Sequence, residues 1–232
     1  MGKKERLNRT EMLIGDEALE ILGGSHVAIF GLGGVGGSVV EALARAGVGA
    51  LTLVDMDRVD ESNINRQVIA TYDTIGVDKT EAAKKRVLSI CPECEVSTFK
   101  QFVLPGQFGN IGDFSRFDYV VDAIDNIAGK IAIIAAAKDA GVPVISAMGA
   151  GNKMNPEKFM IDDISNTKVC PLAKIMRKKI RELGIENVAA LYSTEEPIKT
   201  GSKTPGSMSY VPPIAGLMIG GYVIRELIKC ND

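Results

Sequence analysis

The segment from residue 26 to residue 47 limits the possible folds more than any other. An apolar run of strand length, His26-Val-Ala-Ile-Phe30, leads directly into Gly31-Leu-Gly33-Gly34-Val-Gly36, and a helical pattern then continues over 35–46 and ends near Gly47. Such glycines allow a tight turn and a close approach to phosphate, which the N–H groups at the start of the helix can bind. With the apolar strand 51–54, the segment predicts a βαβ unit.

Strands and helices alternate through the first 150 residues. An amphipathic helix over 9–22 precedes the first strand and is expected to pack on the core or on a second subunit. Further helices are predicted over 78–90, with Asp78 as the cap, and over 127–140; further strands over 95–99, 117–123 and 142–145, with a short loop-and-helix crossover after 99. The alternation predicts an α/β fold with a doubly wound, Rossmann-like and mostly parallel sheet.

The last 80 or so residues break this regular alternation. Strands over 158–164 and 187–192 flank a basic helix over 171–183, and the segment 193–213 is rich in Gly, Pro, Ser, Thr and Lys. We predict that 193–213 is a mobile loop that covers a substrate. The chain is predicted to be one domain over 1–232, with a nucleotide-binding core over 1–150 and a substrate-facing α/β elaboration over 151–232.

Composition and charge exclude several protein classes. The formal net charge of −2 gives no overall electrostatic reason to bind nucleic acid, so any RNA contact must be local. The basic N-terminus lacks the apolar stretch of a signal peptide, and the apolar segment 211–224 is too short for a membrane span and is expected to be a buried terminal helix. A cytoplasmic protein without membrane contact is expected, with its four cysteines as reduced thiols.

Polar residues behind the glycine turn indicate the chemistry. Asp55 follows the second strand, where a carboxylate can bind ribose hydroxyls in an NAD or an ATP site alike. Asp57 suits the same site, or a helix or loop cap. Asn63 and Arg66 can bind phosphate oxygens, and Lys79 can reach the same phosphates as a point charge. This cluster favours a nucleotide triphosphate over a dinucleotide.

Two aspartates, Asp122 and Asp125, sit at the C-terminal end of the strand predicted at 117–123, the edge where open α/β sheets bind ligands. Carboxylates beside polyphosphate suggest Mg²⁺, which takes one or two of them together with phosphate oxygens. The sequence therefore predicts a magnesium nucleotide site.

The chain resembles the ThiF/MoeB family of adenylating enzymes, which have the ubiquitin-activating-enzyme-like fold. The glycines Gly31, Gly33, Gly34 and Gly36 are followed by Asp55, Asn63, Arg66, Lys79 and Asp125 in that family's order. The resemblance implies that ATP and Mg²⁺ are bound and that a carboxylate attacks the α-phosphate. It assigns the ribose to Asp55, the phosphates to Arg66 and Lys79, and the metal to Asp125. It leaves open a monovalent cation.

Arg9 matches a family arginine that reaches into the site of a neighbouring subunit, which implies a homodimer. The alternative is a surface arginine on a charged helix. Family members that activate sulfur carriers commonly hold zinc with two Cys-x-x-Cys pairs, whereas this sequence has one, Cys91-Pro-Glu-Cys94. No zinc is expected.

The second half resembles the bacterial tRNA threonylcarbamoyladenosine dehydratases. The resemblance rests on Gly149-Ala-Gly151, on 162–167, on Cys170-Pro-Leu-Ala-Lys174 and on 211–216. It implies that ATP activates the threonyl carboxylate beside the anticodon, after which the carbamoyl nitrogen attacks and closes a ring. Cys170 is interpreted as structural, and a sulfur-transfer protein partner is left open.

The local RNA-binding surface is predicted on the basic helix, and the solvated face of a helix is the alternative. The candidate residues are Lys174, Arg177, Lys178 and Arg181, with Lys168 and Lys179 nearby and Lys199 and Lys203 in the loop. Two rival functions remain, a sulfur-carrier adenylyltransferase and a dinucleotide-dependent oxidoreductase. An oxidoreductase would need a proton donor near the nicotinamide, but the one histidine, His26, begins a buried strand away from the ligand edge.

Overall fold

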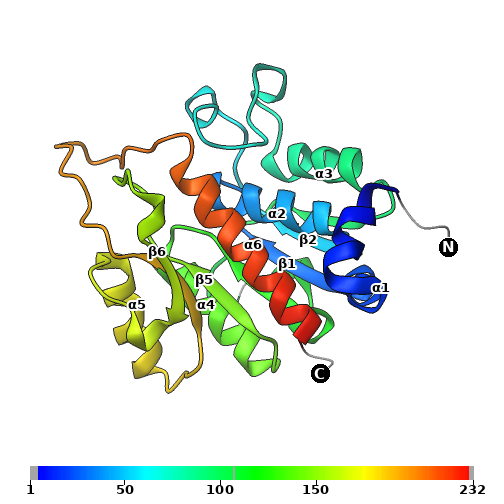
Figure 1. Cartoon of the computed structure of the whole chain (residues 1–232). Coiled ribbons are helices and arrows are strands. Elements are labelled where there is room, and N and C mark those ends of the chain that lie inside the picture. Colours follow the sequence, from blue (N-terminus) through cyan, green and yellow to red (C-terminus); the bar gives the residue numbers. More distant parts are fainter. Residues whose placement is uncertain (1–4, 107, 230–232) are drawn as a thin grey trace.

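The computed structural model describes residues 5–106 and 108–229. Cys230 and residues 1–4 lie outside this range, so the expectations for that thiol and for the start of the chain are not addressed by it. The described chain forms one α/β unit around a seven-stranded sheet (Figure 1).

The sheet has the strand order β3-β2-β1-β4-β5-β7-β6. All neighbouring strands pair in parallel except β6 and β7, which are antiparallel. Chain order turns back between β1 and β4, which is where ligands bind in open sheets of this type. The strands are β1 His26–Phe30, β2 Ala50–Val54, β3 Glu95–Phe99, β4 Tyr119–Asp122, β5 Val144–Ala147, β6 Phe159–Asp163 and β7 Ala189–Ser193.

Helices cover both faces of the sheet, because side chains along each strand alternate between two apolar clusters. In β1, Val27 and Ile29 face one cluster, and Ala28 and Phe30 face the other. The first cluster includes residues of α1 Asn8–Gly24, α2 Gly34–Ala46, α3 Lys79–Ile90 and α6 Val211–Lys229; the second includes residues of α4 Ile127–Asp139 and α5 Pro171–Glu182. The predicted doubly wound architecture is confirmed.

Helix α6 crosses the sheet beside α2 (Figure 1). A Cβ atom at Gly216 would lie 2.2 Å from the Val35 carbonyl oxygen, and one at Gly220 would lie 2.6 Å from Ala42 Cβ. The two helix backbones therefore approach as closely as glycine allows. By length and apolar composition alone α6 could cross a membrane, so the expectation that this segment is too short was wrong, but its packing on α2 is that of a core helix.

Several boundaries differ from the sequence prediction. The fifth strand begins at Val144 rather than at 142 and continues through Ser146, because that buried hydroxyl donates to Asp122 and needs no water. Asp78 precedes α3 but makes no capping bond; its carboxylate accepts hydrogen bonds from Arg58 and Lys100. The short loop-and-helix crossover expected after residue 99 contains two 3₁₀ helices, Gly109–Ile111 and Phe114–Arg116.

The predicted leader helix is α1, which has a break at Gly15, where φ is +83°. The predicted loop is shorter than 193–213 because Ser193 ends β7 and Val211 begins α6. The remaining segment 194–210, called the late loop below, has no regular secondary structure. In Figure 1 it extends from the edge of the molecule back to the start of α6.

Candidate functional site

A cavity of about 520 Å³ opens where β1, β2 and β4 end. Its lining includes the glycine turn, the loops after β2 and β4, the first residue of α3 and Pro212 of α6. Of the predicted site residues it brings together Gly31, Gly33, Gly34, Asp55, Asp57, Asn63, Arg66, Lys79 and Asp125. These residues come from segments far apart in sequence, so the fold gathers them at one edge of the sheet.

The glycine turn requires glycine at two positions. Gly31 has φ +89°, and a Cβ atom there would lie 2.7 Å from the Ala123 carbonyl oxygen at the end of β4. A Cβ atom at Gly36 would lie 1.8 Å from the Gly31 carbonyl oxygen. Helix α2 starts at Gly34 with no side-chain cap, so the N–H groups of its first turn are directed toward the cavity edge. The turn therefore suits an anion.

Asp55 ties the glycine turn to the loop after β2. Its Oδ2 accepts the Leu32 N–H at 2.6 Å and its Oδ1 accepts the Asp57 N–H at 2.8 Å. Each carboxylate oxygen still has a lone pair for a ligand hydroxyl. The position agrees with the predicted ribose contact.

Lys79 and Asp57 form an ion pair at the cavity. Lys79 Nζ donates to Asp57 Oδ2 at 2.9 Å. The lysine side chain is 8 % exposed, although isolated lysines are normally solvated. Asp57 does not cap a helix, as one interpretation of the sequence suggested, but holds this buried ammonium.

Arg66 lies beside the glycine turn. A Cβ atom at Gly34 would lie 3.5 Å from Arg66 Cγ. Arg66 NH1 donates to the Ser62 carbonyl oxygen at 2.8 Å and to Asn65 Oδ1 at 2.7 Å. Asn63 is buried, and its Oδ1 accepts the Asp60 N–H at 3.2 Å in a reciprocal cap. Its carboxamide therefore holds the turn as well as facing the cavity.

Of the two aspartates at the C-terminal end of β4, Asp125 lines the cavity and Asp122 does not. Asp122 is fully buried; its Oδ2 accepts hydrogen bonds from Lys130 Nζ at 3.0 Å and from Ser146 Oγ at 2.6 Å. Asp122 ends β4 as the sequence predicts, but its carboxylate contacts the buried Lys130 and does not line the cavity, because a buried carboxylate needs a buried partner.

Gln67 was not assigned a role from the sequence. It is 6 % exposed and lines the cavity, and its Oε1 has no hydrogen-bond partner within the described residues. Its Nε2 would lie 3.9 Å from a Cβ atom at Gly33. The signal that could have found it is its place directly after Arg66 in a polar segment.

The cysteine pair of the single Cys-x-x-Cys motif is buried. Cys91 Sγ accepts a hydrogen bond from Arg6 NH2 at 2.9 Å. Burial, with smaller contributions from Cys91 and Glu93, raises the pKa of Cys94 to about 12. Within residues 5–106 and 108–229 no three His, Cys, Asp or Glu side chains are grouped as metal ligands.

Arg9 does not join the cavity of its own chain. It is exposed near the start of α1, next to a segment anchored at the opposite edge of the sheet: Leu7 packs against Gly47 at the end of α2, and Arg6 pairs with Glu93 after α3. Its side chain can therefore act only at the surface or in another subunit.

The basic helix α5 borders a second hollow of about 730 Å³. Its lining contains all four predicted RNA-binding residues, Lys174, Arg177, Lys178 and Arg181. Arg177 NH1 donates to Thr167 O at 2.6 Å, and Lys178 lies 3.8 Å from Glu182. The cationic side chains thus share one groove, separate from the nucleotide cavity.

The known proteins that are similar in sequence to this chain agree with one another. The family model described as the ThiF family matches residues 7–232. The chain is 40 % identical to the tRNA threonylcarbamoyladenosine dehydratase of Bacillus subtilis, over 97 % of this chain and 95 % of that protein. It is 41 % identical to the Haemophilus influenzae protein of the same name, over 77 % of this chain and 68 % of that one.

Solved structures agree with the sequence relatives. The chain is similar to the Escherichia coli tRNA threonylcarbamoyladenosine dehydratase solved in complex with ATP, with a TM-score of 0.89 and 32 % identity over 98 % of this chain and 95 % of that one. The shared fold, the cavity residues and the match over nearly the whole length point the same way. This chain belongs to the ThiF family.

Proposed function

We propose that this protein is an ATP-dependent tRNA threonylcarbamoyladenosine dehydratase, which activates the threonyl carboxylate of that nucleoside and so allows it to cyclise. The observation that carries the proposal is the gathering of Arg66, Lys79 and Asp125 in the glycine-turn cavity of a chain that resembles such dehydratases over nearly its whole length. A cavity that only held a dinucleotide would not need this charge.

Different cavity residues would bind different parts of ATP. The glycine turn and the α2 N-terminus bind phosphate, and Asp55 accepts the ribose hydroxyls. Arg66 and Lys79 stabilise the negative charge that develops as the carboxylate attacks phosphorus. Attack on the α-phosphate gives an acyl-adenylate and pyrophosphate, whereas attack on the γ-phosphate gives an acyl-phosphate and ADP.

Asp125 suits Mg²⁺ bound together with ATP. A single carboxylate at the cavity is enough because Mg²⁺ fills its remaining positions with phosphate oxygens and water. Bound there, Mg²⁺ would neutralise phosphate charge. Asp122 takes no part because its carboxylate is committed to Lys130.

Ring closure needs positioning more than further catalytic groups. The carbamoyl nitrogen is tethered to the activated carbonyl carbon, so the attack is intramolecular. The C–N bond forms, the activated oxygen leaves with its phosphate, and the nitrogen loses its proton to solvent. No cysteine nucleophile is required, which agrees with the burial of Cys170.

The substrate tRNA would be held along α5. The groove lined by Lys174, Arg177, Lys178 and Arg181 provides cations of the kind that bind phosphates without reading base sequence. The helix starts beside the turn after β5, since a Cβ atom at Gly149 would lie 3.9 Å from Cys170 Sγ, and it continues away from there. This path would guide the RNA backbone from the carboxyl edge of the sheet outward.

A homodimer would complete the nucleotide site. Arg9 stands at the wrong edge of its own subunit, and the neighbouring Met12 and Leu13 are each 85 % exposed. Apolar side chains so exposed on α1, with Leu217 half exposed on α6, favour burial against a second copy. The partner's Arg9 would then reach the phosphates.

We place the protein in the cytoplasm, where its substrate is found.

ATP consumption with three candidate substrates tests the proposal. The protein should consume ATP rapidly with tRNA that carries threonylcarbamoyladenosine and slowly with the same tRNA lacking that modification. Stimulation instead by a sulfur-carrier protein ending in Gly-Gly would favour the rival adenylyltransferase and overturn the proposal. Measuring whether pyrophosphate or ADP accumulates identifies the phosphorus atom attacked.

A further inference from the structure

The late loop touches the polar segment that carries Arg66. Asn65 Nδ2 donates to the Ser207 carbonyl oxygen at 3.1 Å, across 142 positions of sequence. Between 198 and 210 every residue is exposed except Ser207. The loop is therefore docked at this point, and its neighbouring residues project into solvent.

The same Asn65 side chain also holds Arg66. Asn65 Oδ1 accepts from Arg66 NH1 at 2.7 Å, and the Ser62 carbonyl oxygen accepts from the same nitrogen at 2.8 Å. Two acceptors thus occupy NH1 and fix the plane of the guanidinium. Nε and NH2 remain for a phosphate, since a guanidinium carries five N–H donors in a rigid fork.

A second observation is an unfavourable contribution to the free energy of the docked loop. Ser207 Oγ is buried and has no hydrogen-bond partner within the described residues. A buried hydroxyl without a partner costs about 1–3 kcal/mol, so the docked loop is held against a penalty.

Asn152 also holds the loop: its Oδ1 accepts the Gly206 N–H at 2.6 Å, its N–H donates to the Gly206 carbonyl oxygen at 2.8 Å, and its carbonyl oxygen accepts the Ile198 N–H at 2.8 Å. Tyr210 Oη donates to the Met154 carbonyl oxygen at 3.0 Å. The contact of Asn65 with Ser207 is the one among these that joins the loop to the segment carrying Arg66.

We propose that Asn65 is a positioning residue that couples docking of the late loop to the orientation of Arg66. When the loop is docked, its carbonyl orients the Asn65 carboxamide, and that carboxamide presents Arg66 to the phosphates. By linkage, a nucleotide that uses Arg66 in this orientation stabilises the docked loop to the same degree. The inference rests on the phosphate contact of Arg66 within the proposed function.

Two substitutions at position 65 separate the two bonds. Asn65→Asp keeps an acceptor for Arg66 but loses the donor to Ser207. Asn65→Ala loses both. Ser207→Ala is the matched control because it removes only the unpartnered hydroxyl and leaves the carbonyl that Asn65 contacts.

Limited trypsin digestion of the full chain reports docking because Lys199 and Lys203 are exposed within the loop. Saturating ATP·Mg should slow cleavage there by about fivefold or more in the wild type and in Ser207→Ala, the lower end of typical coupling. Neither Asn65 variant should show this protection. ATP binding, measured by calorimetry, should weaken about tenfold in Asn65→Ala, the equivalent of one hydrogen bond to a charged group. In Asn65→Asp it should weaken by about fivefold, because this variant keeps the acceptor for Arg66 but loses the coupling to the loop.

The proposal is overturned if wild-type cleavage does not respond to ATP, or if either Asn65 variant keeps protection of wild-type size. If Asn65→Ala fails to fold, judged by circular dichroism, Asn65→Asp decides alone. No RNA is present, so a failure here leaves the dehydratase proposal standing, and a failure of tRNA turnover leaves this coupling intact.

Discussion

Lys79 Nζ lies 2.9 Å from Asp57 Oδ2, and the pair joins a side chain that is 8 % exposed to one that is 61 % exposed. The nearly buried ammonium thus has as its partner a carboxylate that water can reach. Under the proposed function, a nucleotide phosphate would compete with Asp57 for this ammonium, and the ion pair would hold Lys79 in position for it.

Asp57→Ala should lower the melting temperature more than Lys79→Met. The first change leaves a buried cation without its partner, whereas the second leaves an exposed carboxylate that water solvates. Each kcal/mol lost should lower the midpoint by about 2–4 °C in a chain of this length. Calorimetry checks the order, and equal or reversed midpoints would contradict it. Saturating ATP·Mg should restore part of the loss in Asp57→Ala.

Asp125→Ala should abolish ATP-dependent turnover, by at least about 100-fold, without unfolding the protein, because its carboxylate lines the cavity at the sheet edge. Asp73→Ala is the control, since Asp73 is exposed and lies outside the cavity. Steady-state ATP consumption measures the effect. Near-native turnover by Asp125→Ala would show that the metal assignment is wrong.

Lys130→Met should cost about 3–5 kcal/mol of unfolding free energy, since it leaves the Asp122 carboxylate buried and uncompensated. The double variant Asp122→Asn with Lys130→Met should be less destabilised than Lys130→Met alone, because no charge is left behind. Urea denaturation gives both values. A double variant that is less stable than the single one would refute the assignment of this network as a buried ion pair.

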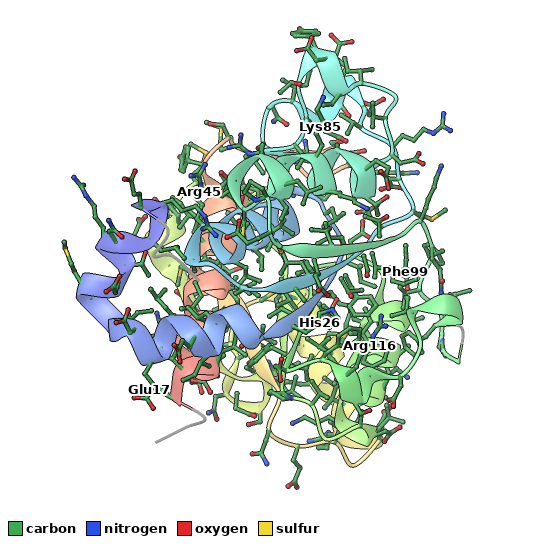
Figure 2. All side chains as sticks on the ribbon, turned by 90° about the vertical axis from the view of Figure 1, so that its right-hand side faces the viewer. Glu17, His26, Arg45, Lys85, Phe99 and Arg116 are labelled. Atoms are coloured by element: carbon green, nitrogen blue, oxygen red, sulfur yellow. The ribbon has the colours of Figure 1, made fainter. Side chains whose placement is uncertain are left out.

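His26 should make stability depend on pH on the acid side. Burial, and secondarily Arg116, lower its pKa below 6.5, against smaller opposing effects of Asp118 and Glu95. Figure 2 shows His26 and Arg116 in the same region, and the His26 ring packs edge-on against Phe117 at 5.0 Å. Below pH 6.5 His26 binds a proton more readily in the unfolded chain than in the folded chain. The free energy of unfolding therefore falls as the pH falls through that value.

The variant His26→Gln isolates this effect. Its unfolding free energy should change less than that of the wild type between about pH 7 and pH 5, the window just below the unfolded pKa. Parallel pH profiles for the two proteins would contradict the assignment. Above pH 7 the profiles should run parallel, since His26 is neutral in both states there.

Binding of tRNA should depend on salt through α5. Lys174→Ala and Lys178→Ala should each weaken binding to all tRNAs alike and should reduce the slope of log affinity against log salt by about 0.7–0.9, the value for one lost phosphate contact. Lys84→Ala on α3 is a control outside the groove. An unchanged slope in both groove variants would exclude α5 as the RNA surface. Arg177→Ala is less informative because its guanidinium also holds Thr167.

Sequence patterns predicted the fold well where local chemistry decides it. The strands 26–30 and 95–99 were placed to the residue, because each is bounded by glycine or polar residues that end the pattern. The fifth strand was placed two residues too early because Ser146 is polar, and its burial is explained by Asp122 and Lys130, which are 24 and 16 positions away. The periodicity of apolar residues does not reveal hydrogen-bond partners that are distant in sequence.

The residues of the cavity could also be predicted only in part from the sequence. The order of Asp55, Arg66, Lys79 and Asp125 predicted that these residues meet, because they follow strands that end at one edge of the sheet. The sequence did not separate Asp122 from Asp125, since only the fold decides which of the two faces Lys130. Nor did it predict the contact of Asn65 with Ser207, which depends on where an irregular loop folds back.

The most direct measurement of the central claim is the mass of the modified nucleoside. The protein is incubated with ATP·Mg and tRNA carrying threonylcarbamoyladenosine, the RNA is digested to nucleosides, and the nucleoside is weighed by mass spectrometry beside a reaction without ATP. The proposed dehydratase predicts that the nucleoside loses one water only when ATP is present. A nucleoside of unchanged mass after complete incubation with ATP would contradict it.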